Sequence, residues 1–135
     1  MAKGLQKHQA HQDKLSLLGK DLARRAKSQC ELSGQSGVPL TIYEAIESDE
    51  PSLNTTCMLC DDSLSDIKRL PKKNNLAANQ HWRCLSNSIW SEVPIIQALS
   101  YKLLELIDLD WSKDLLEQVY LTEEVEALLP SINFD

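Results

Sequence analysis

Two short cysteine-containing segments hold the residue types best suited to chemistry in this chain. Segment 30–33 (CELS) presents the thiol of Cys30, and segment 57–60 (CMLC) presents those of Cys57 and Cys60. Two such segments, each with potential ligands three positions apart and well separated from the other along the chain, are typical of a zinc ribbon or a treble-clef knuckle. In these folds four nitrogen or sulfur ligands surround one ion. The pattern predicts a metal-binding unit with Cys30, Cys57 and Cys60 as zinc ligands.

The fourth ligand of this predicted site is open. Ser33 stands where a second cysteine is expected, and its neutral hydroxyl is a poor zinc ligand beside a thiolate. Cys84 or His81 could fold back to complete the set. Three alternatives follow: zinc with a substitute ligand, weak zinc on three sulfurs, or no stable metal and cysteines that act as small buried side chains.

Composition restricts the class of protein. The chain has 135 residues, 42% of them hydrophobic, which is the size of one domain, 1–135. We expect no transmembrane helix because no long apolar run exists, and a cytoplasmic location because the N-terminus lacks the apolar core of an export signal. In a reducing compartment, cysteine pairs indicate metal binding or redox chemistry more often than structural disulfides. No motif combines a nucleophile, a base and an orienting group, so we expect no catalytic residues and a non-enzymatic role.

Charge is distributed unevenly along the chain. Basic residues dominate the first 29 positions, whereas acidic residues dominate positions 92–135, and the net charge is −6. The two ends could dock on each other, or the basic end could face nucleic acid, or both could be solvated helix faces. The candidate nucleic-acid contacts are Lys20, Arg24, Arg25 and Lys27. His8 and His11, three positions apart, are expected to be solvated.

Hydrophobic periodicity predicts three parts. Residues 1–28 form an amphipathic helix with Leu15, Leu18, Leu22 and Ala26 on one face. Residues 29–71 form the zinc-ribbon-like unit, with strands near 38–43 and 53–57 and a helix that ends before Pro71. Residues 76–129 form helices, including 93–107, 111–120 capped by Asp110, and a last one capped by Thr122.

Trp82 and Trp90 are expected as core anchors; the alternative makes them stacking platforms beside Arg83. The predicted fold class is α+β: a long N-terminal helix, a small zinc-ribbon or treble-clef-like β-hairpin and a C-terminal helical bundle.

Several of these segments resemble one known family. Residues 20–32, 36–44, 57–60 and 81–94, above all the string HWRCLSNSIWSEVP, are similar to the PhnA (alkylphosphonate utilisation operon protein) family in its longer proteobacterial form with an N-terminal zinc-ribbon-like domain. The resemblance covers residues 2–125. It implies metal ligands at Cys30, the position of Ser33, Cys57 and Cys60, and an accessory or regulatory binding module associated with phosphonate metabolism. Family members typically carry a further C-terminal β domain, which we expect to be absent here.

Two other functions remain open at this point. One is a nucleic-acid-binding zinc-ribbon-type module. The other is a metal-dependent hydrolase acting on phosphonates, which would need a metal with an open coordination position. An HNH nuclease is not expected because the predicted hairpin offers no histidine. For partners, the Ile- and Leu-rich segment 95–107 could bind another protein or form a homodimer through the C-terminal helices.

Overall fold

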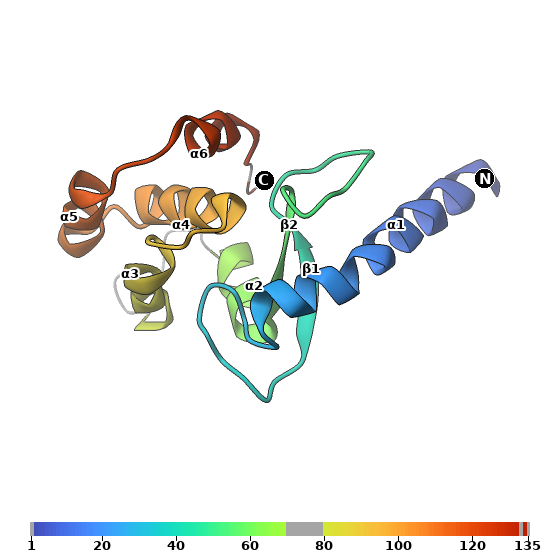
Figure 1. Ribbon diagram of the computed structural model, residues 1–135, viewed down its shortest axis with the longest axis horizontal. Coiled ribbons are helices and arrows are strands. Elements are labelled where there is room, and N and C mark those ends of the chain that lie inside the picture. Colours follow the sequence, from blue (N-terminus) through green and yellow to red (C-terminus); the bar gives the residue numbers. More distant parts are fainter. Residues whose placement is uncertain (1, 70–79, 133, 135) are drawn as a thin grey trace.

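The computed structural model describes residues 2–69, 80–132 and 134, and in this part of the chain the fold is α+β and mostly helical (Figure 1). The strands form one two-stranded antiparallel sheet. The predicted helix end at Pro71 lies outside the described residues. The elements in chain order are α1 (Ala2–Ala26), β1 (Leu40–Glu44), β2 (Thr56–Cys60), α2 (Asp61–Arg69), η2 (Gln80–Cys84), α3 (Leu85–Ser88), α4 (Pro94–Ile107), α5 (Asp110–Gln118), α6 (Glu123–Leu128) and η3 (Leu129–Ser131).

Helix α1 packs against the hairpin and the loop after β1, while its N-terminal end extends away from the rest of the molecule (Figure 1). Leu15, Leu22 and Ala26 are buried, as their helical spacing predicts. The helix ends at Ala26 because Lys27 and Ser28 adopt left-handed backbone conformations, with φ of 56° and 60°. This reversal directs the chain back toward the hairpin.

The hairpin pairs Leu40 with Cys60 and Tyr43 with Cys57. Its second strand therefore begins later than predicted and contains both cysteines of segment 57–60. The cause is a turn before the strand, in which the Thr55 backbone N–H donates to the Ser52 carbonyl at 3.1 Å and the Thr56 hydroxyl donates to the same carbonyl at 2.7 Å. Polar side chains here hydrogen-bond to the backbone within a turn, so these backbone groups do not pair with a neighbouring strand.

The C-terminal helices bury the Ile- and Leu-rich face of α4 against α5, α6 and β2. The Ile and Leu side chains that could have bound another protein or formed a homodimer are therefore mostly buried inside the molecule, although Leu106 is 39% exposed. Thr122 caps α6 as predicted, because its hydroxyl accepts from the Val125 N–H at 3.3 Å. Asp110 does not cap α5; Leu109 holds that position, and its N–H donates to the Ser112 hydroxyl at 2.9 Å.

The two tryptophans of segment 81–92 have different environments. Trp82 is a core residue with 1% of its surface exposed, whereas Trp90 is 50% exposed, so the expectation of two core anchors is wrong for Trp90. Arg83 lies 4.7 Å from the centroid of the Trp111 ring, a cation–π contact. Across the described residues, every helix falls short of the length or the apolar character needed to span a bilayer.

Candidate functional site

Four side chains from two distant segments form a compact group, which we call the thiol–hydroxyl cluster: Cys30, Ser33, Cys60 and Ser63. The Ser63 hydroxyl lies 3.4 Å from the sulfur of Cys30 and 3.4 Å from that of Cys60. The Ser33 hydroxyl lies 3.7 Å from the Cys60 sulfur, and the Ser33 N–H donates to the Cys30 sulfur at 3.4 Å. Cys30 and Cys60 are each 2% exposed and Ser63 is fully buried, whereas Ser33 is partly exposed.

Local backbone structure sets the positions of these groups. Residues 29–36 form a tight turn in which the Cys30 N–H donates to the Gln35 carbonyl at 2.9 Å and the Gly34 N–H donates to the Cys30 carbonyl at 2.8 Å. Gly34 has φ of +77°, a conformation that favours glycine. On the other side, Cys60 ends β2 and Ser63 lies in the first turn of α2. The cluster thus joins a turn to a strand–helix junction.

Cys57 occupies a different place from the one that the sequence pattern predicts. Side chains alternate between the two faces of a strand, and Cys57 and Cys60 are three positions apart within β2, so they leave opposite faces. The Cys57 sulfur lies 3.9 Å from the Tyr43 carbonyl oxygen. Burial, and to a smaller extent the Glu31 carboxylate, raises the pKa of the Cys57 thiol well above its usual value. Cys57 behaves as a protonated core residue.

The residue that sequence reasoning missed is Ser63. A signal was available, because segment 60–63 (CDDS), like segment 30–33 (CELS), has a cysteine followed three positions later by a serine. A search for cysteine pairs selects segment 57–60 instead, since it holds two thiols. In the structure, segment 30–33 is matched by segment 60–63 and not by segment 57–60.

Cys84 and His81 were the candidate replacements for the fourth ligand. Cys84 is partly buried at the end of η2; burial, and then the nearby Cys30 and Cys60 sulfurs, raises its pKa to about 12. Its thiol therefore lies within electrostatic reach of the cluster and stays protonated. The side chain of His81 lies outside what the structure describes.

Cys30 differs from the other two perturbed thiols because its pKa is lowered. Burial acts to raise this pKa, but hydrogen bonds from the Ser33 and Ser63 hydroxyls and from backbone N–H groups together outweigh it. Donors that point at a sulfur favour its thiolate form. The surroundings of Cys30 therefore favour the thiolate form more than those of Cys57 and Cys84 do.

The spacing of the cluster matches a zinc site, but its donor set does not. Around a tetrahedral zinc ion, a sulfur and an oxygen ligand lie about 3.5 Å apart, close to the three separations of 3.4, 3.4 and 3.7 Å. Two of the four donors are neutral hydroxyls, however, and structural zinc takes thiolate and imidazole. Among the described residues, no group of three or more His, Cys, Asp or Glu side chains is arranged to hold a metal. The residues present do not fit zinc.

A buried ion pair braces the cluster from the side of α1. Arg25 donates from Nε and Nη2 to the two carboxylate oxygens of Glu31 at 2.8 and 2.9 Å. Its guanidinium also donates to the carbonyls of Leu53 and Thr56. Arg25 is therefore withdrawn from the basic surface predicted to meet nucleic acid, while Lys20, Arg24 and Lys27 are exposed.

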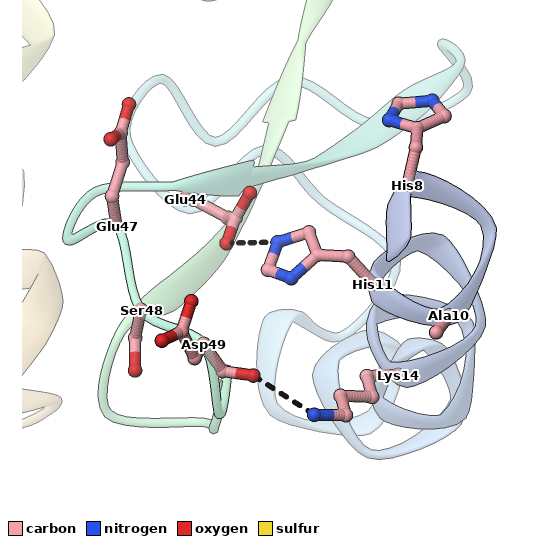
Figure 2. Close-up of a pocket in the computed structure, with 8 residues that line it drawn as sticks. All are labelled: His8, Ala10, His11, Lys14, Glu44, Glu47, Ser48 and Asp49. Carbon is pink, nitrogen blue, oxygen red and sulfur yellow. Dashed lines mark hydrogen bonds and ion pairs between the residues drawn. The ribbon is translucent and has the colours of Figure 1, made fainter. Parts of the chain in front are cut away.

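The second candidate site is a polar cleft of about 800 Å³ between α1 and the loop after β1, shown in Figure 2. His11 Nε2 lies 2.8 Å from Glu44 Oε1. Lys14 Nζ donates to the Asp49 carbonyl at 3.0 Å and to Glu50 Oε1 at 2.8 Å. His11 was expected to be solvated, but the hairpin half-buries it. The signal that could have found the cleft is the shared helix face of positions 8, 11 and 14.

Basic and acidic side chains face each other across this cleft. The α1 wall carries His8, His11 and Lys14, whereas the opposite wall carries Glu44, Glu47 and Asp49. Such a lining can orient a small molecule that has charges of both signs.

Searches with this sequence and structure match no protein-family model, no curated protein and no solved structure.

Proposed function

We propose that this protein is a PhnA-like, non-enzymatic accessory or regulatory binding module associated with phosphonate metabolism. In this proposal, residues 29–71 are a zinc-ribbon-like unit in which hydrogen bonds of the thiol–hydroxyl cluster take the place of a metal. One observation supports this proposal above all. The side chains of segments 30–33 and 60–63 come as close to one another as the ligands of a zinc ion do, but two of the four are hydroxyls, which structural zinc does not take.

A structural role for the cluster follows from its contacts. The four side chains satisfy one another, and Ser63 and both cysteines are buried. Buried polar groups that pair internally fix a local geometry instead of presenting groups to a ligand. Binding is therefore assigned to the polar cleft.

The cleft would take a small zwitterion. Lys14 and His8 offer positive or hydrogen-bonding groups to an anionic end, and Glu47 and Asp49 offer carboxylates to an ammonium end. Amino-substituted phosphonates have this charge arrangement, which connects the cleft to the metabolism that the family resemblance implies.

Metal analysis tests the proposed unit. We expect the wild-type protein to retain well under one equivalent of zinc after purification, and the Ser33→Cys/Ser63→Cys variant to retain one equivalent, since it supplies four thiols. A Ser65→Cys/Ser86→Cys variant is the matched control, because it also adds two thiols but at exposed positions outside the cluster. One tightly held zinc ion in the wild type would contradict the proposal.

Titration calorimetry tests the cleft. We expect 2-aminoethylphosphonate to bind more tightly than ethylphosphonate or ethanolamine, each of which lacks one of the two charges. Lys14→Gln and Asp49→Asn should each weaken binding, whereas Lys20→Gln, outside the cleft, should leave it unchanged. Equal affinity for all three compounds would refute a zwitterion site.

Nucleic-acid binding is a second candidate because Lys20, Arg24 and Lys27 remain exposed near the end of α1. Binding to a DNA or RNA duplex should then weaken steeply with added salt. In a plot of the logarithm of the binding constant against the logarithm of the salt concentration, each lost phosphate contact should reduce the slope by about one unit. Arg25 is excluded from that surface by Glu31. For a metal-dependent hydrolase, the cluster supplies no suitable donor set, so no hydrolytic step is derived.

A further inference from the structure

We propose that Cys30 and Cys60 form a redox-modification site, which closes into a reversible disulfide on reaction with a peroxide.

The first argument is proximity. Both sulfurs contact the same Ser63 hydroxyl at 3.4 Å, so they can be no further apart than twice that distance. The backbones that carry them are joined by a hydrogen bond from the Glu31 N–H to the Met58 carbonyl at 2.9 Å. Rotation of the two side chains past the serine would bring the sulfurs together.

The second argument is access. A cavity of about 310 Å³ opens beside the cluster and is lined by Cys30 and Ser33 on one side and by Asn87 and Ser91 on the other. A peroxide is small enough to enter it, and polar groups around the opening can hydrogen-bond to it. The cavity thus brings a peroxide up to Cys30, which is otherwise 2% exposed.

The third argument is reactivity. The Ser33 N–H and the Ser63 hydroxyl surround the Cys30 sulfur, and donors of this kind stabilise a thiolate, the form that attacks peroxides. The Cys30 thiolate attacks one peroxide oxygen, the O–O bond breaks, and Cys30 becomes a sulfenic acid as hydroxide leaves. The Cys60 thiol then displaces water from that sulfenic acid and forms the S–S bond. In sum, two thiols and one hydrogen peroxide give one disulfide and two waters.

The choice of Cys60 as resolving thiol follows from the structure. Cys57 leaves the opposite face of β2 and contacts the Tyr43 carbonyl. Cys84 lies on η2, and none of the hydrogen bonds described for the cluster reaches it. The disulfide would tie the 29–36 turn to the start of α2, the two segments that a metal joins in a zinc ribbon.

Thiol counting and peptide mapping of the full chain test this inference. The reduced protein has four thiols; after stoichiometric hydrogen peroxide we expect two, and four again after dithiothreitol. Digestion after glutamate, lysine and arginine places Cys30, the pair Cys57 and Cys60, and Cys84 on three separate peptides, and cyanogen bromide cleavage after Met58 then separates Cys57 from Cys60. The joined peptide should persist in Cys57→Ala and Cys84→Ala and be lost in Cys60→Ala.

A second measurement fixes the order of events. In Cys60→Ser, which keeps a polar group of similar size, dimedone should label Cys30 as a trapped sulfenic acid, while Cys30→Ser should leave Cys60 unlabelled. Several results would overturn the proposal: a disulfide that contains Cys84 or Cys57, a disulfide between two chains, or four thiols left intact by peroxide. Each is visible in the wild-type protein, so the conclusion does not depend on a variant that folds.

Discussion

Arg25 and Glu31 form a two-pronged ion pair that is nearly excluded from water, with 17% and 5% of their side chains exposed. The same Glu31 carboxylate accepts from the Met58 N–H at 2.9 Å, and the same guanidinium donates to the carbonyls of Leu53 and Thr56. One pair of residues therefore connects the end of α1, the 29–36 turn and β2. Glu31 is the neighbour of Cys30 in the chain, so the ion pair also holds the turn that carries Cys30.

Replacement of Arg25 should be among the most destabilising single changes in the chain. Arg25→Ala leaves the Glu31 carboxylate buried without its partner, which costs about 3–5 kcal/mol of unfolding free energy. Arg25→Lys keeps the charge but loses the planar fork, so its cost should be intermediate. Urea denaturation followed by circular dichroism measures both.

The matched control is Arg24→Ala, because Arg24 is the exposed neighbour on the same helix. We expect a change within about 0.5 kcal/mol, as for most surface positions. Equal losses for Arg24→Ala and Arg25→Ala would mean that the ion pair contributes little and that helix propensity alone is measured.

Ser63 should contribute more than an ordinary serine of α2. Ser63→Ala removes the hydroxyl that contacts both cluster sulfurs and leaves them less well solvated, with an expected cost of about 1–2 kcal/mol. Ser65→Ala, on the exposed side of the same helix, should be neutral or slightly stabilising, since alanine is the better helix former. Comparable stabilities of the two variants would argue against the cluster as a brace.

Local signals in the sequence predict the helices well. The spacing of Leu15 and Leu22 gives the buried face of α1, and Thr122 is an N-cap by residue type and position. These features depend on neighbours within a few positions, so the chain itself encodes them. Asp110 shows the limit, since α5 already begins at Asp110 and Leu109 holds the N-cap position.

The candidate site was harder to predict because it depends on strand phase. Whether Cys57 or Cys60 faces Cys30 depends on the position of β2 in its pairing with β1. A shift of this pairing by one residue would move every side chain of the strand to the other face of the sheet. The turn at Ser52 and Thr55 sets that start through side-chain hydrogen bonds. The exposure of Trp90 likewise depends on packing between helices and not on its spacing from Trp82.

A buried hydroxyl pair should couple α3 to α4. Ser88 Oγ and Ser100 Oγ are 2.7 Å apart, and the Ser100 hydroxyl also donates to the Ile96 carbonyl. Ser88→Ala and Ser100→Ala should each cost about 1–2 kcal/mol, because each leaves the other hydroxyl less satisfied. The double variant should cost less than the two together, with a coupling of about 1 kcal/mol from a double-mutant cycle in urea. Strict additivity would show that the two hydroxyls do not interact.

Alkaline pH should destabilise the protein through Cys84. Folding raises the pKa of this thiol from 9.0 to about 12, so above pH 9 the unfolded chain loses a proton that the folded chain keeps. The stabilising contribution of Cys84 is therefore complete below pH 9 and declines as the pH rises toward 12, by at most about 1.4 kcal/mol per pH unit. Cys57, whose pKa is also raised, acts in the same direction, whereas the lowered pKa of Cys30 opposes it.

Urea midpoints between pH 8 and pH 11, measured with reductant present, isolate the contribution of Cys84. Cys84→Ala should flatten the decline of stability with pH relative to the wild type, because the variant has one fewer thiol whose pKa differs between the two states. Ser86→Ala, a change at an exposed neighbour, should keep the wild-type slope. If Cys84→Ala and the wild type lose stability in parallel, Cys84 titrates alike in both states, and its burial against the Cys30 and Cys60 sulfurs is not the cause of the alkaline transition.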